Sequence, residues 1–141
     1  MRDENAKRNR PIVYVKAIKA IRVKDDKIII DHIMANTGNA PAVLDQKECD
    51  VLLNGQKDLI AEYVTQTMTI FNGEERYFEI IFNKSKVVRE DKTFDLHIEF
   101  KYSELNYTKT YSYKEDFVIF ANQDGDNFNI INVYRKGCYV D

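Results

Sequence analysis

The chain has no tryptophan, and it contains only five glycines and two prolines in 141 residues. Glycine and proline are the residues that most often interrupt regular secondary structure, so their scarcity predicts long, uninterrupted elements. The remaining composition, with 44% hydrophobic and 31% charged residues, is typical of a globular protein. A chain of this length forms one domain with a sizeable core.

Cysteine and histidine are also scarce, which limits the metal and redox chemistry of the chain. Cys49 and Cys138 match no zinc-binding spacing. They are either two partly buried thiols or a bridge between two strands, which would require an oxidising compartment. His32 and His97 have no second histidine or cysteine at ligand spacing. The sequence therefore predicts no metal site and no cofactor.

Neither sign of charge dominates, since 21 basic and 23 acidic residues are mixed along the chain and give a formal net charge of −2. A phosphate backbone would find no basic face, so nucleic acid is not an expected partner. The longest unbroken apolar run, Phe117 to Ala121, is too short to cross a bilayer as a helix. We expect residues 1–10 to form a flexible polar segment without the apolar core of a signal peptide, and residues 11–141 to form a single domain.

The motifs of common catalytic and nucleotide-binding sites are absent. The chain contains neither of the nucleophile patterns G-x-S-x-G and S-x-x-K, and neither of the phosphate-binding patterns G-x-x-x-x-G-K-[ST] and G-x-G-x-x-G. The stretch Asn122 to Asn127 resembles the start of a calcium loop, but its sixth position is not glycine, and the twelfth is Val133 instead of glutamate. We therefore expect a tight turn there and a protein that is not an enzyme.

Aromatic residues are plentiful, and their pattern predicts β-strands. The nine tyrosines and eight phenylalanines fit a pleated, half-buried surface. In TFDLHIEFKY, residues 93–102, apolar and polar residues alternate strictly, which predicts an antiparallel strand with His97 on its solvated face. Seven further segments have strand character, giving about eight strands in a sandwich or barrel: 11–23, 27–36, 43–56, 58–71, 76–83, 107–120 and 128–137.

Two of these segments have less regular patterns. Strict alternation in residues 11–23 would place Ile18 on the same face as Lys16 and opposite Val15. In residues 58–69, apolar side chains recur at helical spacing and also at strand spacing. The threonines of that segment favour a strand, and both alternatives stay open.

The segment ANTGNAPAV, residues 35–43, is the most distinctive part of the chain. We expect Gly38 to supply a backbone conformation that other residues resist, and Asn36 and Asn39 to bond their own backbone or to adopt the left-handed region. Pro41 suits a strand start or an edge, and the small Ala42 allows close packing. We interpret this segment as a structural turn that crosses between strands.

A group of tyrosines follows the regular strand of residues 93–102. Tyr107, Tyr111 and Tyr113 form a candidate interaction surface, because exposed aromatic side chains on a sheet can stack on sugars or anchor a protein partner. The alternative is cross-strand packing within the hairpin of residues 93–117, with Tyr102 as a further member.

Several stretches together resemble small immunoglobulin-like β-sandwich domains of bacterial envelope or membrane-anchored proteins of unknown function. They are the strand that ends in N-x-G followed by x-x-P-A, and the segments RNRPIVYV, TIFNGEERYFEIIF and FKYSELNYTKTYSY. The resemblance implies an all-β, antiparallel, two-layer immunoglobulin-like sandwich. Its motifs are structural, so they imply no catalytic residue.

The resemblance also implies a function and a location. We expect a non-catalytic interaction or scaffold module, the soluble part of a bacterial membrane-associated protein on the outside face of the membrane, with its anchor outside this chain. The partner would be another protein, or a second copy joined through edge strands. The alternatives are a sandwich that binds a small ligand or carbohydrate through exposed tyrosines, and a cytoplasmic location.

Overall fold

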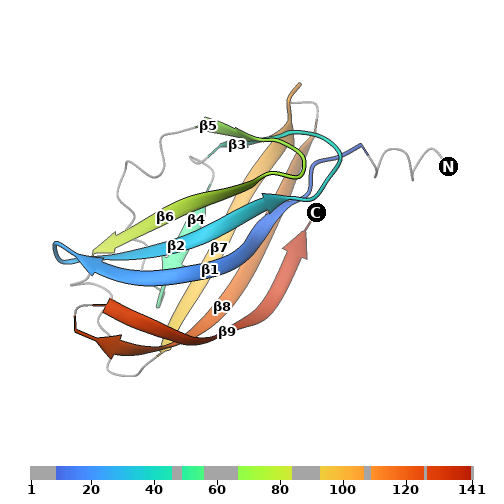
Figure 1. The fold of residues 1–141 in the computed structure, drawn as a ribbon. Coiled ribbons are helices and arrows are strands. Elements are labelled where there is room, and N and C mark those ends of the chain that lie inside the picture. Colours follow the sequence, from blue (N-terminus) through green and yellow to red (C-terminus); the bar gives the residue numbers. More distant parts are fainter. Residues whose placement is uncertain are drawn as a thin grey trace.

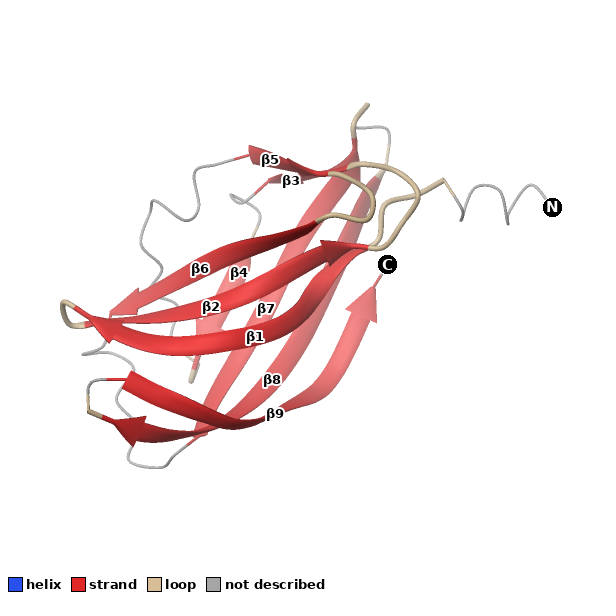
Figure 2. Ribbon diagram, in the orientation of Figure 1, coloured by secondary structure: helices blue, strands red, loops and turns tan. Residues whose placement is uncertain are grey.

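The computed structural model describes residues 9–45, 49–55, 67–83, 93–106, 109–125 and 127–140. These residues form an all-β, antiparallel fold, and no helix occurs among them (Figure 2). Nine strands are present: β1 Val13–Lys24, β2 Lys27–Asn36, β3 Ala42–Asp45, β4 Asp50–Leu53, β5 Thr67–Ile70, β6 Glu75–Asn83, β7 Thr93–Glu104, β8 Thr110–Asp124 and β9 Asn127–Val140.

The strands form a single sheet that is nearly closed into a barrel, in the order β5-β3-β7-β8-β9-β1-β2-β6, with β4 also paired to β7. Strands β1, β2 and β6 lie on one side of the core, and β7, β8 and β9 lie on the other (Figure 1). Among the described residues, one ladder pair joins the two groups, Ile21 of β1 with Phe128 of β9. Two separate sheets, as in an immunoglobulin-like sandwich, are therefore not confirmed.

The core confirms the alternation predicted for residues 93–102. In β7 the apolar residues of that segment are buried, whereas Asp95 and Lys101 are exposed on the other face. At the centre, the rings of Phe100 and Tyr113 stack 4.8 Å apart, and both side chains are completely buried. The expected hairpin exists, since β7 pairs with β8 along nearly its whole length.

Bulges bend the two strands that join the halves of the sheet. In β1 the pairing with β2 skips Lys16 and Lys19, so the inward-facing residues are Val15, Ile18 and Ile21. The alternation expected for residues 11–23 is therefore wrong at Ile18, because each extra residue shifts the following side chains to the other face. In β9 the pairing with β8 skips Ile131 and Lys136 in the same way. Bulges increase strand twist, which lets the sheet turn from one side of the core to the other.

The tight turns follow the sequence signals. Asp25 and Asp26 both have positive φ in the β1–β2 hairpin, as do Asn54 and Gly55 after β4. Gly125 has φ 61° at the β8–β9 turn, which confirms the Asp-Gly turn expected in place of a calcium loop. None of the described segments forms a helix that is long and apolar enough to span a membrane.

The segment after β2 is a crossing between the two sides of the core. Strand β2 pairs with β1 and β6, whereas β3 pairs with β5 and β7. Asn36 is buried, and its side chain accepts hydrogen bonds from the amides of Ile12 (3.1 Å) and Gly38 (3.0 Å). The same side chain donates to the carbonyls of Ala40 (2.9 Å) and Ile70 (3.0 Å). One amide group therefore ties the chain before β1, the crossing and β5 together.

The reason for glycine at position 38 differs from the expectation. Positive φ occurs among the described glycines at positions 55, 73 and 125, and Gly38 is not one of them. A Cβ at Gly38 would lie 2.1 Å from the carbonyl oxygen of Arg10 and 2.6 Å from the amide nitrogen of Ile12. The backbone of residues 10–12 passes directly over Gly38, so close approach requires the glycine. Asn36 and Asn39 also have ordinary φ, while Pro41 precedes β3 and the buried Ala42 begins it.

Other expectations concern parts of the chain with less description. The segment 43–56 contains two short strands, β3 and β4, instead of one, which accounts for nine strands in place of about eight. Residues 67–70 of the ambiguous segment form β5, and residues 56–66 lie outside the described residues.

Cys49 is buried beside β4, and two strands separate it from Cys138 in β9. The side chain of Cys138 lies outside the described residues, so both alternatives for the two cysteines stay open.

Candidate functional site

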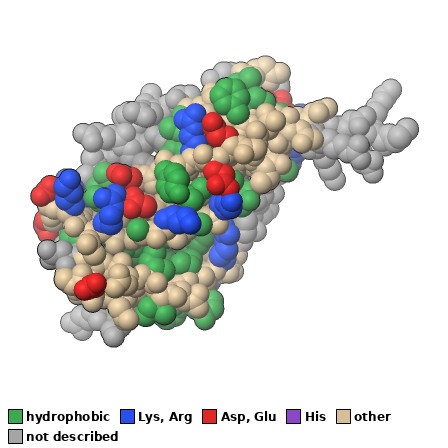
Figure 3. Space-filling view, viewed as in Figure 1, with side chains coloured by type: hydrophobic (Ala, Val, Ile, Leu, Met, Phe, Trp, Pro, Cys, Tyr) green, Lys and Arg blue, Asp and Glu red, His purple; other side chains and the backbone are tan. Residues whose placement is uncertain are grey.

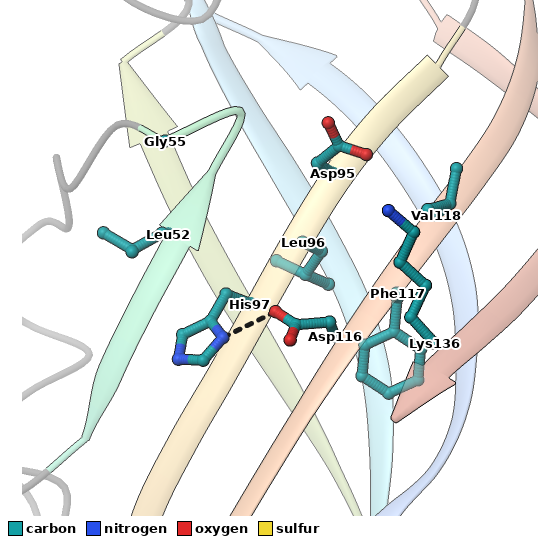
Figure 4. A pocket seen from close by; sticks show the side chains of 9 residues that line it. All are labelled: Leu52, Gly55, Asp95, Leu96, His97, Asp116, Phe117, Val118 and Lys136. Atoms are coloured by element: carbon teal, nitrogen blue, oxygen red, sulfur yellow. Dashed lines mark hydrogen bonds and ion pairs between the residues drawn. The ribbon is translucent and has the colours of Figure 1, made fainter. Parts of the chain in front are cut away.

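The outer face of β4, β7, β8 and β9 holds a pocket of about 330 Å³ (Figure 4). It lies outside the core, at the place where the short β4 and its Asn54-Gly55 turn rise beside β7. The lining combines aliphatic side chains with two carboxylates, an imidazole and an amine: Leu52, Gly55, Asp95, Leu96, His97, Asp116, Phe117, Val118 and Lys136.

His97 and Asp116 form the polar centre of this pocket. They are directly opposite one another in the β7–β8 ladder, and Nδ1 of His97 lies 2.6 Å from Oδ1 of Asp116. Nε2 of His97 lies 3.3 Å from Oε2 of Glu99, two residues along the same strand. Both ring nitrogens therefore face a carboxylate. The expected solvated face is confirmed, but the imidazole on it is held by two partners and is only 19% exposed.

The two carboxylates change the acid–base behaviour of His97. Partial burial lowers the pKa of the imidazole, but the hydrogen bonds to Asp116 and Glu99 outweigh this effect and raise the pKa above its ordinary value. The ring thus carries a positive charge over a wider range of pH than a free histidine. The imidazole can exchange a proton with a bound group, but none of the described residues that line the pocket has a hydroxyl or thiol side chain.

The described residues contain no group of three or more histidine, cysteine or acidic side chains arranged to hold a metal ion. His97 bonds the carboxylates of Asp116 and Glu99, and Asp116 lines the same pocket. Lys136 and the two aspartates offer charges of both signs, and Leu52 and Val118 offer apolar surface. Such a lining suits a ligand with polar ends and an apolar body.

Exposed aromatic side chains continue the same face beyond the pocket. Val118 is opposite Tyr134 in the β8–β9 ladder, and Phe120 lies two residues further along β8. The rings of Phe120 and Tyr134 pack edge to face, 5.5 Å apart, and are 37% and 55% exposed. We call Val118, Phe120 and Tyr134 the aromatic patch. Aromatic residues at such positions are the ones that most often anchor protein partners.

A second polar cluster lies inside the sheet, between β8 and β9. Glu115 is 1% exposed, and its carboxylate accepts hydrogen bonds from Nε (2.5 Å) and Nη2 (2.8 Å) of Arg135. The hydroxyl of Tyr113 also donates to Glu115. The carboxylate raises the pKa of Arg135, and burial together with the same carboxylate raises the pKa of Tyr113. The cluster is thus an ion pair in which the Glu115 carboxylate is buried and hydrogen-bonded, while Arg135 is partly exposed.

The predicted tyrosine surface has a different arrangement from the one expected. Tyr113 is completely buried in the core, so it cannot belong to an exposed surface. Tyr111 is half-buried between the Arg10 guanidinium, 4.3 Å from the ring centre, and the ring of Tyr102, which it stacks upon at 5.5 Å. Tyr107 lies outside the described residues. Cross-strand packing, the alternative weighed from the sequence, therefore accounts for Tyr102 and Tyr111.

His32 belongs to the core. It is completely buried, and its ring stacks on Phe78 with the ring centres 5.7 Å apart. Neither ring nitrogen has a hydrogen-bond partner among the described residues. Burial lowers the pKa of His32 to about 4, so the ring is neutral at pH 7.

The aromatic patch and the His97–Asp116 pair did not follow from the sequence. The predicted strands, residues 93–102 and 107–120, leave residues 103–106 for the turn and would pair His97 with a residue nearer to it. In the structure β7 continues to Glu104, and the register places Asp116 opposite His97. Phe120 and Tyr134 could be assigned to the outer face only with the bulges of β9 known.

Comparison of the chain with protein-family models, with curated proteins and with solved structures finds no match.

Proposed function

We propose that this chain is a non-catalytic binding module that recognises a protein partner through the outer face of β7, β8 and β9. The observation that carries the proposal is the aromatic patch, because two exposed rings lie beside a 330 Å³ pocket on one rigid sheet face. Buried aromatic anchors supply most of the energy of protein interfaces, and an adjacent pocket accepts a side chain of the partner.

A binding role is favoured over catalysis because the part of the pocket lining that the structure describes contains no hydroxyl or thiol nucleophile. A hydrogen-bonded histidine and aspartate can move a proton, but acyl or phosphoryl transfer also needs a nucleophile or a metal. Strands of a sheet hold side chains more rigidly than loops do, which suits a preorganised binding surface.

We also propose, on the resemblance described above, that the fold is an immunoglobulin-like sandwich from a bacterial membrane-associated protein. The single residue pair between β1 and β9, together with the crossing from β2 to β3, supports a two-layer description. The anchor would lie outside the chain, on the outside face of the membrane. Reading whether an apolar segment is encoded in frame before residue 1 tests the anchor.

The experiment for the binding surface compares two sets of exposed aromatic residues. Phe120→Ser with Tyr134→Ser removes both exposed rings of the aromatic patch, and Tyr77→Ser on β6, 75% exposed, removes a ring elsewhere. Proteins crosslinked to the wild-type chain in native cells are identified, and their affinities are measured with purified components. We expect the patch variant to weaken binding at least roughly tenfold and Tyr77→Ser to leave it unchanged. Equal binding by both variants would contradict the proposal.

A second candidate is a small-ligand or carbohydrate site in the His97 pocket, favoured by its mixed lining of charged and aliphatic side chains. A fragment and oligosaccharide library screened by two-dimensional NMR tests this role. Hits should shift the amides of His97, Val118 and Lys136 and should be lost in Val118→Arg. Hits that bind away from the pocket would exclude it.

A further inference from the structure

The sheet has a seam between β1 and β9. These strands are neighbours in the sheet, but Ile21 with Phe128 is their single ladder pair among the described residues. A side chain adds one more link, from the amide of Val23 to Oδ1 of Asn127 at 3.1 Å. From this joined end, β1 extends back to Val13 and β9 extends forward to Val140 without further pairing to each other.

Arg135 occupies the unpaired part of the seam. From β9 its guanidinium donates to the carbonyl of Val15 and, at 3.5 Å, to the carbonyl of Lys16, while two of its hydrogen bonds go to Glu115. Directly paired strands satisfy their carbonyls with backbone amides at a spacing of about 4.8 Å. Here the Arg135 side chain does so instead, in the part of the seam where the described residues form no ladder pair between β1 and β9. The carbonyls of Val15 and Lys16 are acceptors that an additional strand would use.

A cavity of about 250 Å³ lies in the same seam, lined from three strands. Ile18 of β1, Phe117 of β8 and Val133 of β9 form its apolar part, and Lys16, Ala17 and Arg135 complete it. Figure 3 shows hydrophobic side chains in the band between the charged face of β1, β2 and β6 and the strand β9. The cavity therefore offers an apolar side-chain site next to unpaired backbone.

The charges along the seam are basic. Lys16 and Lys19 are the two bulge residues of β1, and Lys136 is a bulge residue of β9 that also lines the His97 pocket. All three are exposed, and Lys16 is in an ion pair with Glu75 of β6. Lysines and bulges on an unpaired edge prevent two edges of the same kind from joining. A second copy of this chain would bring lysines against lysines. An acidic strand would instead find complementary charge.

We propose that the seam between β1 and β9 binds an extended acidic peptide segment of a partner protein by β-strand addition. The segment lies between the two strands, and its backbone bonds the free edges of both. One apolar side chain enters the cavity beside Phe117, and the acidic side chains of the peptide face Lys19 and Lys136 and compete with Glu75 for Lys16. The entering amides replace the contacts of Arg135 with Val15 and Lys16, while Arg135 keeps its bonds to Glu115. This site is separate from the aromatic patch and does not depend on it.

The test begins with a random-peptide display library panned on the full chain. We expect the selected peptides to alternate apolar residues with aspartate or glutamate. Binding of a synthetic copy is followed by fluorescence anisotropy, and amide hydrogen exchange locates it. Protection of residues 13–20 and 129–140 supports the proposal. Protection of β5, β6 or the His97 pocket instead overturns it, as does a library that returns no acidic peptide.

Charge-reversal variants separate the seam from general attraction between opposite charges. Lys19→Glu with Lys136→Glu should weaken peptide binding roughly tenfold at physiological salt. Lys24→Glu with Lys101→Glu makes the same change of net charge at exposed positions outside the seam and should leave binding nearly unchanged. A peptide with proline at alternate positions lacks the backbone donors and should not bind. Equal loss in both double variants would contradict strand addition at the seam, whereas the patch variant Phe120→Ser with Tyr134→Ser should bind the peptide normally.

Discussion

Arg135 in β9 binds the carboxylate of Glu115 in β8 through two hydrogen bonds of 2.5 and 2.8 Å, and Glu115 is 1% exposed. The pair places a charge within the wall of the core at the place where the sheet is least complete. Removal of Arg135 would leave the carboxylate of Glu115 buried without compensation.

Arg135→Met should therefore lower the free energy of unfolding by about 3 kcal/mol, the low end for buried pairs, because Arg135 is partly exposed to water. Urea denaturation followed by circular dichroism measures the change. The double variant Arg135→Met with Glu115→Leu removes both charges, and it should recover most of the lost stability. A double variant that is as unstable as Arg135→Met would show that the ion pair is not the cause.

Asn36→Ala should lower the free energy of unfolding by about 3 kcal/mol or more, because four backbone groups lose the partner that its side chain supplies. Asn39→Ala is the matched control, since Asn39 is exposed in the same segment and should change stability by less than about 0.5 kcal/mol. Chemical denaturation of the two variants provides the comparison. Similar losses would mean that the segment, and not the Asn36 amide, is responsible.

Gly38→Ala should destabilise the protein by about 3 kcal/mol, because the added Cβ would meet the carbonyl oxygen of Arg10 at 2.1 Å and the backbone would have to move. Gly125→Ala has no atom within 4 Å of its Cβ, and its cost of about 1 kcal/mol would come from positive φ alone. Thermal unfolding should therefore give a clearly lower melting temperature for Gly38→Ala than for Gly125→Ala. The reverse order would indicate that residues 10–12 are free to shift.

His32 should make stability fall as the pH is lowered. Its folded pKa, about 4, is below the unfolded value of about 6.5, so the unfolded state takes up the proton first. The contribution of His32 to the free energy of unfolding, about 3 kcal/mol in total, is fully present above pH 6.5. It is lost as the pH falls from about 6.5 to 4. His32→Phe keeps the ring beside Phe78 and removes the proton site. The free energy of unfolding is measured against pH for the wild-type protein and for His32→Phe. The wild-type protein should lose more stability than the variant between pH 6.5 and 4, and parallel curves would refute the prediction.

The contribution of His97 to stability should depend on pH in the opposite direction. Its pKa is raised in the folded state, so its stabilising contribution is present below the unfolded pKa and is lost as the pH rises through the folded pKa. NMR titration of the imidazole resonance should give a pKa above 6.5 in the wild-type protein. Asp116→Asn should lower that pKa clearly, and Asp95→Asn, also in the pocket, should lower it much less. Equal shifts would mean that general charge, and not the hydrogen bond, holds the proton.

The sequence predicted the elements of this fold better than their arrangement. Strict alternation identified β7, and the stretch Asn122 to Asn127 identified the turn between β8 and β9, because these signals are local. Bulges have no comparable signal. Lys16 and Lys19 read as ordinary polar positions of a strand, and Ile18 was assigned to the wrong face for that reason.

The candidate site was the least predictable part. A pair such as His97 and Asp116 depends on the register between two strands, and a turn placed a few residues too early changes every pair in the ladder. Gly38 is a second case in which the sequence does not show which distant segment contacts a residue. Its position in a turn was evident, but the chain that crosses it, residues 10–12, is brought there only by the tertiary fold.

The narrow join between β1 and β9 also has a consequence for how the chain reaches its native state. The link from Val23 to Asn127 spans 104 residues of sequence, so the loop that it closes costs much entropy and should form late and slowly. During synthesis, the edge of β1 that faces β9 therefore has no partner until nearly the whole chain has left the ribosome. An unpaired strand in a growing chain invites aggregation. The lysines at the bulges of β1 would then oppose aggregation of the nascent chain, before they have any role in the folded protein.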